Sequence, residues 1–262
     1  MSNLNVRVLK EPLGFIRVIE FPMAILAFAT TAGFFVTTTL SVPCTGGKKE
    51  LVDIPWGYPF ALASWMMPGD LCGSDKNPDH HPFSAGAQSQ SQFFVFVGVI
   101  SFFYILAIFA VYLLLWSKYE NDGRFALGDF VATAVLALFW FIASCAWASG
   151  LGIVKGQTSA EEIQSRINDK GGPFPCNATA ATPAPGSTAA PITCTVSNHW
   201  NYASLNVSVI AGFACFGLWL ANLWFIYKET PWYKARAAIS TPTGGQGVTS
   251  GPASSTGGHT FR

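Results

Sequence analysis

The residues of this chain with the most capacity for chemistry are polar side chains set in or beside long apolar runs. Glu20, Asp129 and Asn222 are the prominent ones. Carboxyl groups at membrane depth are typical of ion pathways and proton relays. Glu20 and Asp129 lie toward the ends of their runs, however, where ion pairing or helix capping is enough to explain a carboxylate. We expect Glu20 to pair with Arg17 or to snorkel outward, and Asp129 to cap a helix that begins there. For Asn222 we expect a hydrogen bond to a neighbouring helix.

A metal or catalytic site has little support in the sequence. Asp79-His80-His81 has ligand-type side chains, but adjacent histidines rarely converge on one ion without further ligands, so we interpret this segment as a solvated loop. HExxH, P-loop, Gly-rich nucleotide-binding and G-x-S-x-G motifs do not occur in the sequence. We therefore predict that the protein is not an enzyme and that it has no catalytic, metal or cofactor-binding residues.

Four long apolar runs must position these polar residues, and they define the fold class. Each is about 20 to 25 residues long, which is enough to cross a ~30 Å hydrocarbon core as a helix. Charged residues make up only 11% of the chain, well below the usual share in soluble domains. The sequence predicts an all-α membrane protein, a four-transmembrane-helix bundle with helices at about 18–40, 93–117, 129–153 and 204–227.

The bundle is expected to occupy residues 18–230, between a short cytoplasmic N-terminus, 1–17, and a disordered cytoplasmic tail, 231–262. The first apolar run is too long for a signal peptide, so we interpret it as a retained helix. Cations gather on the side that we assign to the cytoplasm, whereas the loops 41–92 and 154–203 carry both signs. These cations are Arg7, Lys10, Arg17, Lys118, Arg124, Lys228, Lys234 and Arg236.

Both ends of the chain are therefore predicted to be cytoplasmic, and the two larger loops to lie outside the cell or in a lumen. The longest basic stretch is Lys48–Lys49, so no nucleic-acid partner is expected.

Each of the two larger loops contains two cysteines. Cys44 and Cys72 lie in the first, and Cys176 and Cys194 in the second. Pairs in an oxidising compartment favour one disulfide within each loop, although four cysteines allow three pairings and free thiols are the alternative.

The second loop has two parts with different character. Thr158–Lys170 has the pattern of a short amphipathic helix with Ser159 near its start, although a plain solvated segment fits nearly as well. Asn177–Thr195 is rich in Ala, Thr and Pro and is expected to be disordered. It begins with an N-glycosylation sequon at Asn177. A second sequon, at Asn206, stands at the edge of the fourth run, too close to lipid for easy modification.

Small residues recur four apart in the apolar runs, as at Ala29 and Gly33 and at Ser144 and Ala148. This spacing permits close approach of helices. Packing within the bundle and association with a second copy or a partner helix are both consistent with it.

The chain resembles the synaptophysin family, which includes synaptophysin, synaptoporin, pantophysin and mitsugumin. The resemblance extends from about residue 4 to 230. It is carried by Leu9–Glu20, Ala27–Gly33, Gly57–Phe60, Asp129–Ala148 and Ser204–Thr230.

That resemblance implies a MARVEL-type tetraspan bundle in the membranes of synaptic or other transport vesicles. It also implies a disulfide in each lumenal loop, N-glycosylation, association with cholesterol and homo-oligomerisation. A synaptobrevin-type vesicle SNARE is the implied protein partner, in regulated exocytosis and endocytosis. The tail after Tyr233 has no tyrosine, so phosphotyrosine signalling from the tail is not supported.

A vesicle-organising role has two alternatives. An oligomeric channel or transporter would need a polar lining, which a single chain of this composition lacks. A junctional or adhesion tetraspan would be expected to show claudin or tetraspanin loop motifs, and the sequence has neither.

Overall fold

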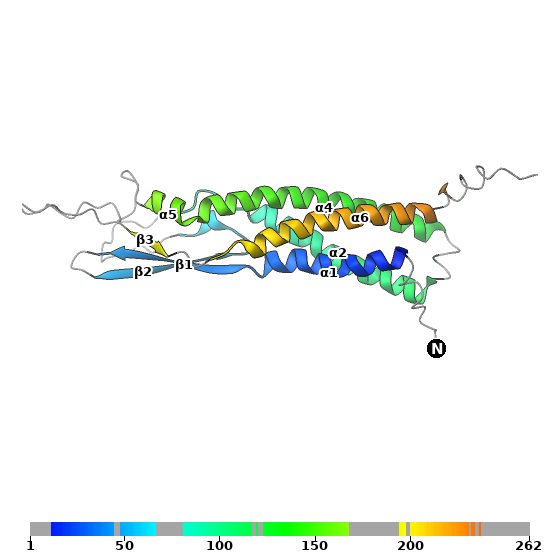
Figure 1. The fold of residues 1–262 in the computed structure, drawn as a ribbon, viewed down its shortest axis with the longest axis horizontal. Helices are drawn as coiled ribbons and strands as arrows, with labels where there is room; N and C mark the ends of the chain where they lie inside the picture. The colour runs from blue at the N-terminus through cyan, green and yellow to red at the C-terminus, as the bar shows by residue number, and fades with distance from the viewer. Residues whose placement is uncertain are drawn as a thin grey trace, which may run out of the picture.

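Four long helices and a three-stranded sheet form one elongated molecule in the computed structural model (Figure 1). The structure describes residues 12–44, 48–66, 81–116, 119, 123–167, 194–197, 200–230, 232–233 and 236. The long helices are α1 (Pro12–Ala32), α2 (Gln88–Leu114), α4 (Gly123–Thr158) and α6 (Ala203–Glu229).

Each long helix is long and apolar enough to cross a membrane, with mean hydropathy between 1.7 and 2.7 in its most apolar window. The predicted four-helix membrane bundle is therefore confirmed. At 1.5 Å per residue, α1 is about 32 Å long and α4 about 54 Å long. Since the hydrocarbon core is about 30 Å thick, α4 extends well beyond it.

The predicted bounds of the first helix were wrong at both ends. We expected 18–40, but α1 begins at Pro12 and ends at Ala32. Proline is well tolerated in the first turn of a helix, where its missing N–H has no helical partner. Beyond Gly33, the β-branched run from Val36 to Thr39 continues as a strand. The other three helices overlap their predicted ranges, and α4 exceeds its range at both ends.

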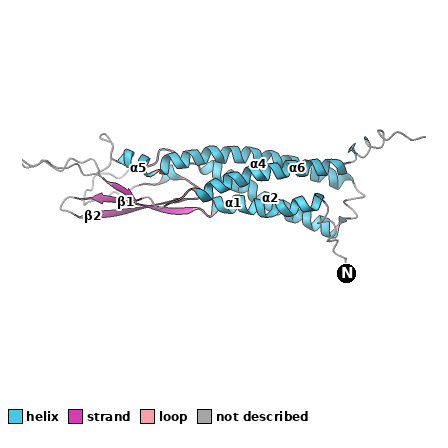
Figure 2. Cartoon of the chain, viewed as in Figure 1, coloured by secondary structure: helices cyan, strands magenta, loops and turns pink. Residues whose placement is uncertain are grey.

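A small antiparallel sheet replaces the end of that first apolar run. β1 (Phe35–Pro43) pairs with β2 (Lys49–Gly57) along its whole length, from Phe35 opposite Gly57 to Pro43 opposite Lys49. β3 (Thr195–Ser197) pairs with the other edge of β1. The strand order is β2-β1-β3 (Figure 2), so the sheet joins the two predicted loops into one unit.

A tight segment connects the sheet to the bundle. Gly57 passes so close to Phe34 that an added Cβ would collide with the Phe34 carbonyl. Phe60 follows with a positive φ of 61° and is fully buried. Its ring packs 5.2 Å from that of Trp147 and 6.0 Å from that of Phe34. The aromatic core of the bundle therefore continues into the base of the sheet.

The short amphipathic helix predicted in the second loop is confirmed as α5 (Ala160–Ile167). Ser159 accepts a hydrogen bond from the Glu162 amide at 3.3 Å, as a capping residue does. Ile163 and Ile167 are buried on its inner face.

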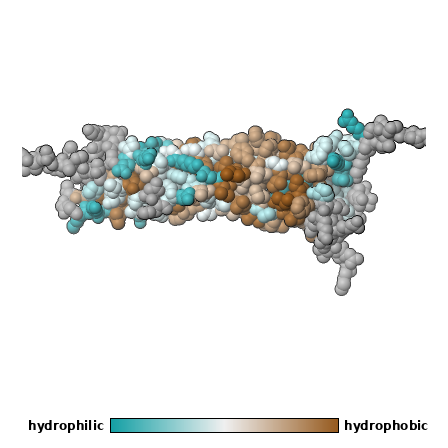
Figure 3. Space-filling view, in the orientation of Figure 1, coloured by the Kyte–Doolittle hydropathy of each residue, from teal (hydrophilic) through white to brown (hydrophobic). Residues whose placement is uncertain are grey.

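The two ends of the molecule differ in composition. The start of α1 and the end of α6 lie at one end, whereas α5 and the sheet lie at the other (Figure 1). Apolar surface covers much of the helical part, and polar surface increases toward the sheet (Figure 3).

Candidate functional site

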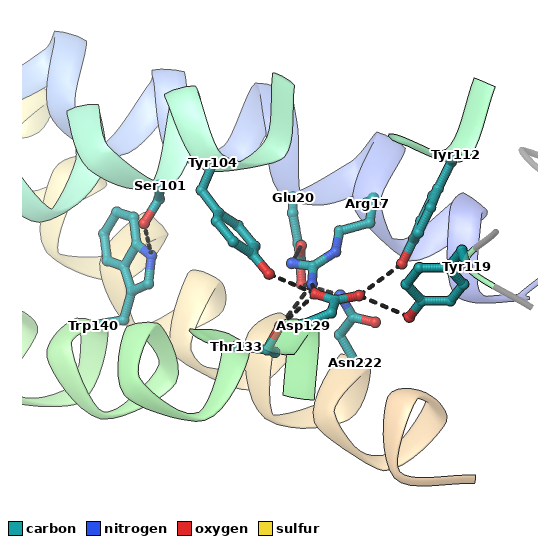
Figure 4. Close-up of polar contacts among 10 residues, drawn as sticks. All are labelled: Arg17, Glu20, Ser101, Tyr104, Tyr112, Tyr119, Asp129, Thr133, Trp140 and Asn222. Atoms are coloured by element: carbon teal, nitrogen blue, oxygen red, sulfur yellow. Dashed lines mark hydrogen bonds and ion pairs between the residues drawn. The ribbon is translucent and has the colours of Figure 1, made fainter. Parts of the chain in front are cut away.

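Three charged side chains meet in the interior of the bundle, near the end at which α1 begins (Figure 4). Arg17 and Glu20 come from α1 and Asp129 from α4, and their exposed fractions are 0%, 0% and 4%. Arg17 Nη1 donates to Glu20 at 2.9 Å, and Arg17 Nη2 donates to Asp129 Oδ1 at 2.7 Å. Buried carboxylates and guanidinium groups are tolerated only when they are paired and hydrogen-bonded, as these are.

The carboxylate of Asp129 is the centre of this charge cluster, because five groups donate to it. Oδ1 accepts from Arg17 at 2.7 Å, from the Tyr104 hydroxyl at 2.6 Å and from Thr133 at 3.2 Å, and Oδ2 accepts from Tyr112 at 2.9 Å and from Tyr119 at 3.0 Å. A carboxylate has about four lone-pair sites, so Asp129 has no acceptor capacity left for a ligand.

Tyr119 lies in the short connection between α2 and α4, outside the spans. Burial, followed by the charge of Asp129, raises the pKa of its hydroxyl. The hydroxyl therefore remains a hydrogen-bond donor at neutral pH.

The fourth long helix joins the cluster through Asn222 and Trp219. The Asn222 side-chain amide donates to Glu20 Oε1 at 3.2 Å. The guanidinium of Arg17 lies 4.9 Å from the Trp219 ring centroid and 5.3 Å from that of Tyr104. Stacking of a guanidinium on aromatic rings lowers the cost of keeping the charge away from water. All four long helices thus contribute to one polar centre, which can hold them in a single arrangement.

Farther along the bundle, isolated hydrogen bonds replace the cluster. The indole of Trp140 donates to Ser101 at 3.0 Å, and that of Trp147 donates to Ser208 at 2.8 Å. Between these pairs, α4 and α6 approach closely, since a Cβ on Gly212 would lie 2.6 Å from Ser144 Oγ. Some of the small residues noted in the sequence therefore pack within the bundle.

Two predictions about charged residues were wrong. Asp129 does not cap a helix, because α4 begins six residues earlier at Gly123 and Asp129 is buried in its second turn. Arg17 does not precede the first helix as a flanking cation, because it is a buried interior residue of α1. Glu20 does pair with Arg17, and Asn222 does bond to a neighbouring helix, as expected.

The spacing of these residues in the sequence is a signal for the cluster. Arg17 and Glu20 are three apart, so they share a face of any helix that includes both. Tyr104 and Tyr112 are eight apart in α2, which places them on one face two turns apart. A cation, two carboxylates and a one-sided row of tyrosines in apolar helices indicate a buried polar centre.

The remaining predicted site residues lie in or beside the loops. Cys44 and Cys194 are both disulfide-bonded. Cys72, Cys176 and Asn177 lie outside the described residues, so the pairing within each loop and the glycan remain predictions. Cys145 and Cys215, in α4 and α6, are free thiols.

Of the segment Asp79-His80-His81, only His81 belongs to the described residues, whereas the second sequon is described in full. His81 is exposed, with Nδ1 3.1 Å from the Trp65 carbonyl oxygen, and no group of three metal-ligating side chains occurs in the part of the chain that the structure describes. In the second sequon, Ser208 is buried and bonded to Trp147. Asn206 accepts a hydrogen bond from Lys155 at 2.6 Å.

A comparison with protein-family profiles matches residues 8–225 to MARVEL, described as a membrane-associating domain. The match includes all of the charge cluster, the sheet and most of the four spans. The match agrees with the fold, since the four apolar helices make up about half of the matched region and extend from one end of it to the other. The chain therefore belongs to the MARVEL family of multi-pass membrane proteins.

Proposed function

We propose that this protein is a vesicle membrane protein of the synaptophysin type. In this proposal it organises cargo and lipid by lateral association with a synaptobrevin-type SNARE and with cholesterol, and both ends of the chain face the cytoplasm. The common position of the start of α1 and the end of α6 at one end of the bundle supports this topology (Figure 1).

The observation that carries the proposal is the division between a polar interior and an apolar exterior. The charge cluster is internally bonded and fully inside the bundle. The outer faces of the spans instead carry large exposed apolar side chains, including Phe15, Phe96, Phe103, Val131, Leu138, Ile210 and Trp224. Such a surface suits lipid tails and the apolar helix of a partner.

α2 has the outer face best suited to a partner helix. Phe96, Ile100 and Phe103 have exposed fractions of 52%, 39% and 63%. They recur at i, i+4 and i+7, so they form one stripe along the helix. Flat aromatic rings provide large contact areas at small conformational cost, because few torsions are ordered on binding.

An oligomeric channel is the alternative, and it would require polar groups on the faces that meet between copies. Most of the large exposed side chains along the described spans are apolar, and the exposed charged residues Arg124, Lys228 and Glu229 lie at the helix ends. Asp129 has its acceptor capacity filled. These observations favour lateral association over conduction.

Reconstitution of the full chain with synaptobrevin in cholesterol-containing vesicles tests the proposal. We expect crosslinking at membrane depth between the two proteins. The double variant Phe96→Leu/Phe103→Leu should weaken it about fivefold, which corresponds to about 1 kcal/mol. The matched control, Phe125→Leu/Phe141→Leu, changes two exposed phenylalanines of α4 and should leave crosslinking unchanged. Equal crosslinking of the unaltered protein and both double variants would argue against the α2 surface. If the unaltered protein does not crosslink to synaptobrevin at all, SNARE binding is overturned.

A further inference from the structure

We propose that a groove between α4 and α6, at the sheet end of the bundle, is a phospholipid site. One acyl chain would lie along the groove, and the phosphodiester would contact the ammonium of Lys155. The groove has a volume of about 420 Å³ and is lined by Ala148, Gly152 and Lys155 of α4 and by Asn206, Val209 and Ile210 of α6. This volume lies within the ordinary range of small-molecule sites.

The groove arises where the close packing of the two helices ends. At Ser144 and Gly212 the helices leave no room for a methyl group. About two turns nearer the sheet, an added Cβ at Gly152 would meet nothing within 4 Å. Gly152 is exposed, so the wall of the groove is open to the surrounding lipid. An acyl chain could therefore enter sideways from the bilayer.

Lys155 lies at the depth where phosphate groups are found. No charged residue occurs between Asp129 and Lys155. These roughly 25 helical residues span about 37 Å, slightly more than the ~30 Å hydrocarbon core. Lys155 thus ends the apolar part of α4 at a membrane interface, and α4 continues for only three residues beyond it.

The charge of Lys155 selects the occupant. Its Nζ donates to Asn206 Oδ1 at 2.6 Å and lies 5.9 Å from the Tyr202 ring centroid. None of the ion pairs found among the described residues includes Lys155. An ammonium has three donors, and the contact with Asn206 orients the group without neutralising it. A phosphodiester supplies the missing negative charge, whereas a sterol hydroxyl does not.

The full chain in phosphatidylcholine nanodiscs, with a photoactivatable phosphatidylcholine that carries its diazirine in one acyl chain, tests this site. We expect label on peptides that contain residues 148–155 and 206–210. Gly152→Leu would fill the groove and should lower this label about fivefold to tenfold, as loss of ~1 to 1.4 kcal/mol of binding does. The matched control is Gly128→Leu, since Gly128 is also exposed on α4 with nothing within 4 Å of an added Cβ.

A second pair of variants tests the charge. Lys155→Gln should lower the label by a similar factor, whereas Lys155→Arg should retain it. Unchanged unfolding temperatures would show that each variant is folded.

Three outcomes would overturn the site. These are uniform labelling of all four spans, insensitivity of the label to Gly152→Leu, and preferential labelling of the groove by a photoactivatable cholesterol in a parallel sample. None of them bears on the SNARE contact proposed for α2, which is on a different helix.

Discussion

The two ends of the bundle are stabilised by different kinds of interaction. Near the start of α1, ion pairs and hydroxyl groups converge on Asp129. Toward the sheet, aromatic rings pack around Phe60 and Trp147, with single hydrogen bonds such as that from Trp147 to Ser208. A buried charge network fails severely when one partner is removed, because an unpaired charge remains. Aromatic packing loses stability in proportion to the contact removed.

The largest effect is expected from Asp129→Asn, which leaves the Arg17 guanidinium with only Glu20 as a charged partner. We expect a loss of about 3–5 kcal/mol, as is usual when a buried pair is broken. Thermal unfolding of the purified protein in detergent measures it. Glu20→Gln is the matched control and should cost less, because among the described residues Glu20 accepts from Arg17 and Asn222, whereas Asp129 accepts from five groups. Equal losses in the two variants would contradict the central role of Asp129.

Overpacking at the close approach of α4 and α6 should have the next largest effect. Gly212→Leu would push into Phe94 and Ser144, both 2.6 Å from an ideal Cβ, and we expect a loss of about 1–3 kcal/mol. Gly217→Leu makes the same change on the same helix, where nothing lies within 4 Å. The comparison is read from the unfolding temperatures. If both variants unfold at the same temperature, α4 and α6 do not pack as described.

Removal of one hydrogen bond at each end of the bundle should cause a smaller loss of stability, and the size of the loss should differ between the two ends. Ser208→Ala leaves the buried indole N–H of Trp147 without this partner, at a cost of about 1–2 kcal/mol. Tyr119→Phe removes one of five donors to Asp129, and the other four remain, so we expect about 0.6 kcal/mol. Urea or detergent-induced unfolding of both variants provides the measurement. A larger loss for Tyr119→Phe would show that the donors around Asp129 act cooperatively.

The smallest effect is expected outside both regions, on α5. Arg166 Nε donates to Glu162 at 2.8 Å, with side-chain exposed fractions of 29% and 44%. Half-exposed pairs of this kind contribute about 0–1 kcal/mol. Glu162→Gln should therefore shift the unfolding temperature little, and less still at high salt. A marked, salt-independent loss would mean that α5 stabilises the sheet end more than its exposure suggests.

Much of the architecture could be predicted from local sequence. All four long helices were identified from apolar length, although the first was placed too far along the chain, and α5 was identified from Ser159 and the spacing of Ile163 and Ile167. The hydrogen bond of Asn222 followed from its isolation in an apolar helix. The β-sheet was not predicted, because Val36–Thr39 was counted as part of a span on apolar length alone, although β-branched residues favour strands.

The charge cluster could not be predicted in the same way. Arg17 and Asp129 are 112 residues apart, and nothing local to either indicates that they meet. Each had a sufficient local explanation, as a flanking cation and as a helix cap, and both explanations were wrong once the helices were found to begin earlier.

By itself, the sequence determined that four apolar helices are present, because apolar length and the absence of charge are properties of contiguous residues. Tertiary structure alone decided which polar groups meet inside the bundle and which faces are left for lipid. The reason is physical: in lipid the helices form individually, but a buried charge is tolerated only where several helices bring its partners together.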